Sequence, residues 1–273
     1  MPELPETETI ATDLNGLVAM QVIKDARALR PDVLRGCAPR DLSRRLSNRV
    51  ISRVWRRAKT VVFDLDDGQR LLVQPRFTGV LRAFAEAQPD DPPYACTRLT
   101  LTESVLVYID VRRLGTFTVA TADEFLAFDR SLGIEPLDPE FTAARLSGIV
   151  RASEKSIKGL LMDQNRIAGC GNIYANEALW GAQIDPSRPG SSISMDEAER
   201  LRAALVDVLR ASIEARGTTF RDYRDANGER GGFAKRLAAY GRAGAPCKRC
   251  GSRLVESHAV DGRSTVFCFR CQQ

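Results

Sequence analysis

Two cysteine pairs, Cys247-Lys-Arg-Cys250 and Cys268-Phe-Arg-Cys271, separated by seventeen residues, decide the fold of the C-terminal end of the chain. Pairs with two-residue spacers at this separation are typical of a zinc ribbon, in which four thiolates bind one ion tetrahedrally. Four thiolates leave no open coordination position, so the predicted Zn²⁺ is structural. His258 lies between the pairs and is expected to be a bystander. The predicted metal ligands are Cys247, Cys250, Cys268 and Cys271.

The remaining cysteines and the histidine limit the chemistry of the rest of the chain. The total of seven cysteines is odd, and Cys37, Cys96 and Cys170 stand singly, which favours small buried side chains over a disulfide framework. His258 is the only histidine, so Ser-His-Asp, Cys-His and multi-histidine metal catalysis are excluded. Acid–base chemistry must come from carboxylates, amines or cysteine.

Charge is distributed unevenly along the 273 residues, a length that predicts two domains. Residues 216–273 hold 12 Lys and Arg against 5 Asp and Glu, whereas the whole chain carries a net charge of +5. The basic C-terminal region is therefore expected either to face a polyanion or to be a solvated surface. No stretch reaches the ~18 apolar residues of a membrane span, and the acidic N-terminus is unlike a targeting segment. We expect a cytoplasmic protein without a membrane partner.

The N-terminal half combines a helix with strands. Ile10, Leu14, Leu17 and Val18 have the spacing of one helical face, preceded by prolines and carboxylates that suit a helix start. Residues 50–120 contain several short strand patterns, with a hairpin turn at Asp66-Asp67-Gly68, and a loop over 88–93. This spacing predicts an antiparallel sandwich or barrel.

The texture becomes helical beyond a proline-rich link at 133–139. Ser194-Met-Asp-Glu197 predicts a capping box for a helix that continues through Ile213, with Gly217 where it should stop. A further helix is expected over roughly 156–165, and another from Asn172. The fold class is therefore α+β.

The turn Gly169-Cys-Gly-Asn172 between two predicted helices has two interpretations. Its glycines permit close backbone approach, and the N-terminus of the following helix offers N–H groups to an anion. Taken alone, the turn is equally well explained by tight packing. The basic ribbon downstream favours phosphate binding, to which Lys158 on the preceding helix would add charge and Arg263 a contact from the ribbon.

The N-terminus carries a candidate nucleophile. Removal of Met1 would expose Pro2 as a secondary amine with a pKa near ~8, so a useful fraction is unprotonated at neutral pH. A secondary amine that attacks a sugar aldehyde carbon gives an iminium that cannot lose an N–H proton and acts as an electron sink. Glu3 and Glu6 could supply acid–base function nearby. The alternative is that this segment only starts a helix.

Motifs that span the chain in order carry a family resemblance. They are Pro2-Glu3-Leu4-Pro5-Glu6, Arg56-Arg57-Ala58-Lys59, Asp110-Val-Arg112-Arg113-Leu-Gly115, Leu132-Gly-Ile-Glu-Pro-Leu137, Gly169-Cys-Gly-Asn-Ile-Tyr-Ala175, Tyr240-Gly-Arg242 and the four-cysteine ribbon. Together they resemble the bacterial formamidopyrimidine-DNA glycosylase and endonuclease VIII family, and its formamidopyrimidine-DNA glycosylase branch in particular.

The resemblance implies a DNA-repair glycosylase and abasic-site lyase. Pro2 would attack C1′ of the damaged nucleotide, Glu3 would act as acid and base on the sugar, and Glu6 would support the site. Lys59 would lie near the lesion and its phosphate. Implied domains are an N-terminal helix and β-sandwich over 1–130, a linker over 131–145, a helix–two-turn–helix domain over 146–236, and a zinc finger over 237–273.

The resemblance also implies how DNA is held. Asn172, with Lys158 behind it, would hold phosphates from the helix–two-turn–helix element, and Arg263, grouped with the catalytic residues, would do so from the ribbon. Arg113 and Tyr240 lie in matching motifs and are expected to contact DNA. Because base excision requires an extruded nucleotide, a wedge must offset the lost stacking.

Several departures from the family pattern affect the wedge. The family usually has His-Leu-x-Met-x-Gly where this chain has Gln74-Pro-Arg-Phe77-Thr-Gly79, and Asp-Pro-Arg-Arg-Phe-Gly where it has Asp110-Val-Arg-Arg-Leu114-Gly115. The residues that fill the void would be Phe77, Arg112 and Leu114. Phe77 could instead be a core residue of the sandwich. In the lesion-facing loop, Gly232 replaces the usual tyrosine.

The sequence leaves three functions open. The first is a bifunctional glycosylase and lyase for oxidised purines, acting by β,δ-elimination, which the Gly217-Thr-Thr and Gly-Gly-Phe233 segments favour. The second is an endonuclease VIII-like preference for oxidised pyrimidines or an unusual lesion. The third is a non-catalytic DNA-binding paralogue, against which the intact Pro2, Glu3 and Lys59 argue. The expected partner is damaged double-stranded DNA, bound by a monomer in the nucleoid.

Overall fold

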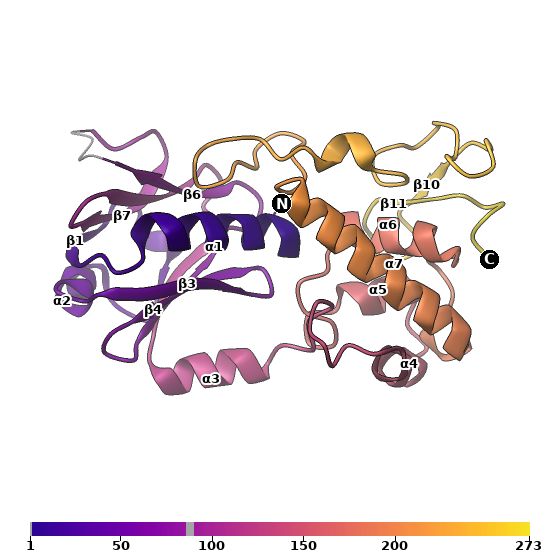
Figure 1. Ribbon diagram of the computed structural model, residues 1–273, viewed down its shortest axis with the longest axis horizontal. Coiled ribbons are helices and arrows are strands. Elements are labelled where there is room, and N and C mark those ends of the chain that lie inside the picture. Colours follow the sequence, from indigo (N-terminus) through magenta and orange to yellow (C-terminus); the bar gives the residue numbers. More distant parts are fainter. Residues whose placement is uncertain (1, 86–89) are drawn as a thin grey trace. The chain divides into compact units, whose positions relative to one another are not determined.

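The computed structural model describes residues 2–85 and 90–273, so Met1 and the first part of the loop predicted over 88–93 lie outside the described residues. The chain forms two compact units (Figure 1). The first runs to Arg130 and also includes Ala215–Gly232, and the second comprises Ser131–Glu214 and Phe233–Gln273. The division at Arg130 coincides with the expected boundary. Residues 215–232, however, were expected within the 146–236 domain and belong to the first unit.

Helix α1 (Leu4–Val18) begins where the sequence predicted a helix start. A capping box joins Glu3 and Glu6, and Pro5 stands in the first turn, where its missing N–H costs no hydrogen bond. Ile10, Leu14 and Val18 are buried in the core of the first unit, whereas Leu17, expected on the same face, is 41% exposed.

Two antiparallel-rich sheets make the sandwich of the first unit. One has the strand order β1-β7-β8-β6 and the other β2-β9-β5-β4-β3. The strands are β1 (Ile23–Ala28), β2 (Leu34–Arg35), β3 (Ile51–Arg57), β4 (Thr60–Leu65), β5 (Arg70–Gln74), β6 (Gly79–Phe84), β7 (Ala95–Leu101), β8 (Val105–Asp110) and β9 (Thr116–Ala120). The predicted hairpin is confirmed: β4 and β5 pair antiparallel across a turn in which Gly68 has φ +82°.

Short helices complete the first unit. They are α2 (Leu42–Leu46), α3 (Ala122–Arg130) and the 3-10 turns Pro31–Val33 and Pro39–Asp41. Helix α3 was not predicted, although Thr121 and Glu124 form a reciprocal cap at its start, with N–H to oxygen distances of 2.7 and 3.3 Å. Phe125 of α3 packs with Val62 and Leu72 on the outer side of the five-stranded sheet.

The second unit is helical and ends in a small hairpin. Its helices are α4 (Ala143–Arg151), α5 (Ile157–Met162), α6 (Asn172–Ala182) and α7 (Met195–Glu214), with 3-10 turns at Gly190–Ser192 and Phe233–Arg236 and strands β10 (Val255–Ser257) and β11 (Thr265–Phe267). α4 begins inside the expected linker, because Thr142 caps it by accepting the N–H of Arg145. The predicted capping box of α7 is confirmed by reciprocal bonds between Ser194 and Glu197.

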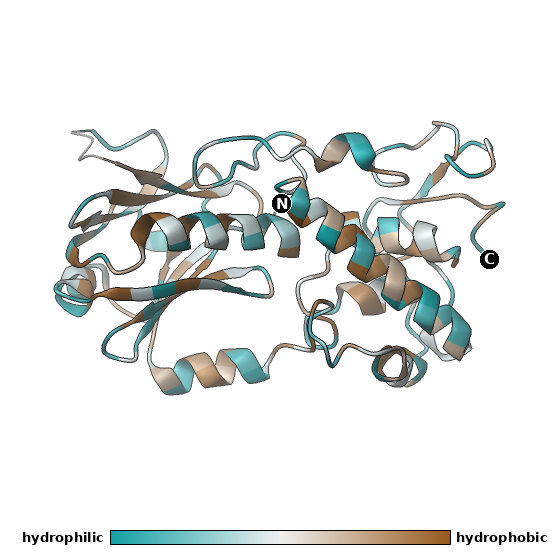
Figure 2. Ribbon diagram, viewed as in Figure 1, coloured by the Kyte–Doolittle hydropathy of each residue, from teal (hydrophilic) through white to brown (hydrophobic). Residues whose placement is uncertain are grey.

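The periodic pattern of apolar residues correctly predicted helix α7. Apolar and polar residues alternate along it in Figure 2, and Ala198, Leu201, Leu205 and Leu209 are buried. Within the described residues, no helix combines the length and apolar character needed to cross a membrane.

A bidentate ion pair anchors the start of α7. Arg188 Nη1 and Nη2 lie 2.5 and 3.0 Å from the two carboxylate oxygens of Glu197, and this pairing lowers the pKa of Glu197 to about 2. Because the folded-state pKa lies below its ordinary value of 4.5, the stabilisation is present above that pH and is lost as pH falls toward 2.

We therefore expect Glu197→Gln to lower the free energy of unfolding by about 1–2 kcal/mol at pH 7, a value reduced for the partial solvent exposure of the pair. The glutamine retains the capping box, so the loss reports the ion pair. Chemical unfolding between pH 2 and 7 measures it, and the two proteins should converge at the acidic end. Glu199→Gln, which removes an exposed pair with Arg202, is the matched control and should change little. A difference that persisted at pH 2 would contradict this account.

Candidate active site and metal centre

The first turn of α1 brings the N-terminal residues into a buried position. Pro2 is buried, and Glu3 and Glu6 are each 1% exposed. The Glu3 N–H donates to Glu6 Oε2 at 2.9 Å as one half of the capping box. The segment is thus a helix start, and the same turn holds two carboxylates beside the residue that Met1 removal would make the chain terminus.

The segment 215–232 closes over Glu6. The Thr218 N–H donates to Glu6 Oε1 at 2.7 Å, so both carboxylate oxygens accept backbone N–H groups. Gly217 precedes this contact with φ +86°, and a Cβ there would lie 2.9 Å from Glu6 Cγ. Only glycine suits this position, both for its backbone conformation and for its approach to Glu6.

A polar network fixes the rest of this segment. Arg216 donates to Asp13 of α1 at 2.5 Å and to the buried Asp225 at 2.5 and 3.0 Å. Asp225 Oδ1 in turn accepts the N–H groups of Asn227 and Glu229. Tyr223 is buried against α1, and burial raises the pKa of its hydroxyl. The residues of this network were not predicted to belong to the site. The Asn227-Gly228 pair, which is typical of a turn, is the one feature of the sequence that indicates an ordered segment here.

Lys59 lies in the turn between β3 and β4, directly after Ala58 at φ +53°. The two arginines of the same motif are tied to carboxylates: Arg56 to Glu8 at 2.7 Å and Arg57 to Asp129 at 2.5 Å. Pro2, Glu3, Glu6 and Lys59 all belong to the first unit.

The residues predicted to form the wedge occupy two loops of the sandwich, 75–79 and 111–115. Phe77 is 44% exposed and Leu114 41% exposed, so the core interpretation of Phe77 is wrong. The Arg112 guanidinium carbon lies 4.8 Å from the centre of the Phe77 ring, a cation–π distance. Arg113 pairs with Asp32 at 3.1 Å, and both side chains are about half exposed.

The four ribbon cysteines converge at the ends of the β10–β11 hairpin. Their Sγ atoms all lie within 4.8 Å of one another, and those of Cys250 and Cys268 are 3.5 Å apart. Zinc–sulfur bonds of about 2.3 Å in a tetrahedron require sulfur separations of this size. The Trp180 indole and the Arg249 backbone each donate an N–H to Cys247 Sγ at 3.4 Å, which stabilises a thiolate. The donor set fits one structural Zn²⁺.

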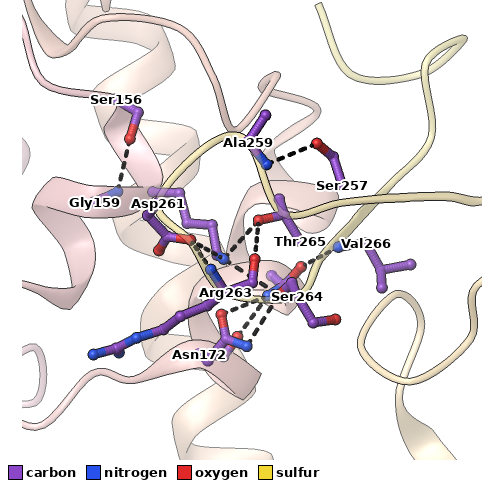
Figure 3. Close-up of polar contacts among 12 residues, drawn as sticks. Ser156, Gly159, Asn172, Ser257, Ala259, Asp261, Arg263, Ser264, Thr265 and Val266 are labelled. Atoms are coloured by element: carbon purple, nitrogen blue, oxygen red, sulfur yellow. Dashed lines mark hydrogen bonds and ion pairs between the residues drawn. The ribbon is translucent and has the colours of Figure 1, made fainter.

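The expectation that Lys158 contributes to phosphate binding is wrong. Its side chain is fully buried, and its ammonium donates to Asp261 at 3.1 Å, to the Ser264 carbonyl at 3.3 Å and to the Thr265 hydroxyl at 2.7 Å (Figure 3). A buried ammonium saturated by three acceptors cannot reach a DNA phosphate. Lys158 therefore ties α5 to the ribbon hairpin.

Asn172 and Arg263 both adjoin Ser264, whose carbonyl accepts a hydrogen bond from Lys158. Asn172 is the first residue of α6, and its amide donates to the Ser264 carbonyl at 3.0 Å. Arg263 is exposed, and Figure 3 shows its side chain extending away from the bonded cluster past Asn172. The turn before α6 also has a packing role, since the Gly169 N–H donates to Gln164.

Tyr240 is positioned by Glu177, which was not predicted as a site residue. The buried carboxylate of Glu177 accepts the N–H groups of Ala238, Ala239 and Tyr240 at 2.7–2.8 Å, which fixes the segment that leads into the ribbon. Glu177 is the sole carboxylate of α6, but no motif or spacing in the sequence gives it a function that the carboxylates of α7 lack.

Comparison with known proteins accounts for this arrangement. Over 274 residues the chain is 38% identical to a formamidopyrimidine-DNA glycosylase of Desulfitobacterium hafniense, with both chains covered in full, and it is 40% identical to that of Thermomicrobium roseum, covering 100% of this chain and 99% of the relative. The chain belongs to the formamidopyrimidine-DNA glycosylase family. Residues 1–117 match the family's N-terminal domain and residues 132–224 its H2TH domain.

Solved structures agree with this assignment. A Lactococcus lactis Fpg variant in complex with Fapy-dG-containing DNA superposes with a TM-score of 0.92 at 30% identity, over 100% of both chains. MutM (Fpg) from Thermus thermophilus gives a TM-score of 0.88 at 36% identity, over 99% of this chain and 98% of that one. As a member of this glycosylase family, the protein is a base-excision-repair glycosylase and abasic-site lyase with an α+β fold and a four-cysteine zinc finger.

Proposed function

We propose that the protein removes oxidised purines, 8-oxoguanine and formamidopyrimidines, from double-stranded DNA and cleaves the strand through an iminium on Pro2. The observation that carries the proposal is the buried first turn of α1, where Pro2 and Glu3 adjoin Glu6 and the closing segment at Gly217 and Thr218. In this proposal one water-poor site holds two carboxylates and, once Met1 is removed, an amine, which suits amine catalysis without histidine.

The chemistry follows from these groups. With Met1 removed, the Pro2 nitrogen forms a bond to C1′ as the bond from C1′ to the damaged base breaks, and the base leaves with the proton that the Pro2 nitrogen gives up. Glu3 donates a proton to O4′ as the sugar ring opens, which leaves a Pro2 iminium. Loss of a C2′ proton then expels the 3′ phosphate, a second elimination expels the 5′ phosphate, and water releases Pro2.

In this proposal DNA is held by phosphate-binding residues and by residues that replace the extruded nucleotide. Lys59, Asn172 and Arg263 bind phosphates, while Phe77, Arg112 and Leu114 fill the space left by the extruded nucleotide. The exposure of Arg263 and of the two apolar wedge residues supports these roles. The protein acts as a monomer on chromosomal DNA in the cytoplasm. Lys158 has no direct part, because its ammonium is consumed within the fold.

The wedge gives a graded prediction. Phe77→Ala is expected to slow excision from intact duplex by about ten- to a hundredfold, since a stacked aromatic contributes roughly 1–3 kcal/mol per base. Leu114→Ala should cost less, because an aliphatic side chain only fills volume. Single-turnover excision from duplex and cleavage of a single-stranded abasic site are compared for each variant. Both melting temperatures should stay near wild type, as the side chains are exposed. A Phe77→Ala protein that excises from duplex at the normal rate would contradict the wedge.

Lesion preference tests the proposed substrate. We expect faster excision of 8-oxoguanine opposite cytosine than of thymine glycol opposite adenine in otherwise identical duplexes. The names of the relatives and the Gly217-Thr-Thr and Gly-Gly-Phe233 segments support purines. Faster removal of thymine glycol would replace this proposal with the endonuclease VIII-like alternative. Binding without cleavage would favour the non-catalytic one.

A further inference from the structure

The two wedge loops share a single buried anchor, the carboxylate of Asp110 at the end of β8. Asp110 is 1% exposed and accepts four hydrogen bonds. Oδ1 accepts from the Thr78 hydroxyl at 2.5 Å and from the Arg112 N–H at 3.1 Å, and Oδ2 accepts from the Gly115 N–H at 2.9 Å and the Tyr108 hydroxyl at 3.1 Å. We propose that Asp110 is a positioning residue that joins the loops 75–79 and 111–115 into one preformed wedge, an inference that rests on the proposed function.

Thr78 makes the connection between the loops. It lies one residue after Phe77, donates its hydroxyl proton to Asp110, and accepts the N–H of Arg112 at 3.1 Å. The Arg112 guanidinium then lies over the Phe77 ring. Asp110, Thr78 and Arg112 are thus each hydrogen-bonded to the other two. Arg112 is itself a wedge residue, and Thr78 follows the wedge residue Phe77.

The loops need such an anchor because burial cannot order them. Phe77, Leu114 and Val111 are each 41–54% exposed, so little apolar area is removed from water. Each loop also contains an arginine in the left-handed region, Arg76 at φ +51° and Arg113 at φ +52°. Non-glycine residues persist in this region only where their surroundings enforce it. The hydrogen bonds of the anchor supply that constraint.

Two glycines near Asp110 also indicate that the loop backbones are tightly packed. A Cβ at Gly115 would collide with the Tyr108 hydroxyl and the Gln74 carbonyl, and one at Gly79 would collide with the Pro75 backbone. Gly115 therefore lets the backbone of its loop pack against the Tyr108 hydroxyl at the Asp110 site, and Gly79 lets the loop 75–79 turn tightly on itself. A wedge already held in its working shape does not lose ordering entropy on meeting DNA. Asp110, being buried, acts only through the residues that it orients.

Thr78→Val tests the anchor, and Tyr108→Phe is its matched control. Each change deletes one hydroxyl bond to the same carboxylate, but only Thr78 belongs to a wedge loop. We expect Thr78→Val to reduce kcat/KM for 8-oxoguanine duplex about tenfold, while cleavage of a single-stranded abasic site stays within about twofold. Thr78→Ser, which retains the hydroxyl, should restore the duplex rate. Tyr108→Phe should lower the melting temperature at least as much as Thr78→Val does. It should leave unchanged the ratio of the rate on 8-oxoguanine duplex to the rate on the single-stranded abasic site, the duplex-to-single-strand ratio.

Phe77→Ala, measured alongside, separates this inference from the proposed function. If Phe77→Ala changes the duplex-to-single-strand ratio and Thr78→Val does not, the anchor is overturned and the wedge stands. If neither changes it, the wedge itself fails and the anchor falls with it. An equal effect of Thr78→Val and Tyr108→Phe on the ratio would reduce Asp110 to a general stabiliser of the sandwich and overturn the inference. A lower duplex-to-single-strand ratio in Thr78→Val that returns to the wild-type value in Thr78→Ser supports the role of Asp110 as the anchor of the wedge.

Discussion

A protein that retains Met1 is expected to lose strand cleavage by at least about a thousandfold, because acylation of the Pro2 nitrogen delocalises the lone pair that must attack C1′. Pro2→Gly, with Met1 removed, should also be severely slowed, since its primary amine is a weaker catalyst of this kind and the segment before α1 loses a constrained residue. Intact-protein mass spectrometry establishes the N-terminus, and gel assays on abasic duplex measure cleavage.

Binding separates loss of chemistry from loss of structure in these proteins. Affinity for a duplex with an uncleavable abasic-site analogue should stay near wild type, because phosphate and wedge contacts do not involve the Pro2 nitrogen. Glu3→Gln is the companion variant: it should lose base excision more than abasic-site cleavage, since a damaged nucleotide needs the Glu3 proton to open its sugar ring, whereas an abasic sugar also opens to the aldehyde in water. Full lyase activity from a protein with intact Met1 would refute Pro2 as the nucleophile.

Loss of the zinc site is expected to have the second largest effect. Cys268→Ser should bind less than one zinc ion per chain and lose about a hundredfold in affinity for abasic-analogue duplex. The buried residues of the ribbon cluster are Leu254, Val266, Cys247 and Cys268, which provide too little apolar area for the ribbon to fold unaided. Arg263 lies between the two cysteine pairs, so its position depends on the ion.

Cys37→Ser is the matched control for that experiment, since Cys37 is a half-buried cysteine of the first unit. It should retain both zinc and DNA affinity. Zinc is measured by elemental analysis and affinity by fluorescence anisotropy. A Cys268→Ser protein without zinc but with normal affinity would remove the ribbon from the DNA-binding account.

Elements with a local chemical signature were predictable from the sequence. The α7 capping box, the Asp66-Asp67-Gly68 hairpin and the cysteine pairs depend on residues close together in the chain. The assignment of residues 215–232 to the first unit was not predictable, because the bond between Thr218 and Glu6 joins positions 212 residues apart. Such contacts appear only once the chain is folded.

Burial decided which predicted site residues keep their proposed roles. Lys158 and Arg263 are both cations that were expected to bind phosphate, and nothing in their spacing predicts that one is enclosed by Asp261 and Thr265 while the other is exposed. The alternation of strand residues likewise left Phe77 open between core and surface. Its place in a turn after β5, outside the strand pattern, exposes it.

The central claim, that Pro2 is the nucleophile, is tested most directly by locating the covalent link to DNA. The protein with Met1 removed is incubated with abasic duplex and borohydride, which reduces an iminium to a stable amine, and the digested adduct is sequenced by tandem mass spectrometry. The account predicts a sugar fragment on the nitrogen of Pro2, at the start of the N-terminal peptide. A fragment on Lys59 or any other lysine, or strand cleavage with no trapped adduct, would contradict it.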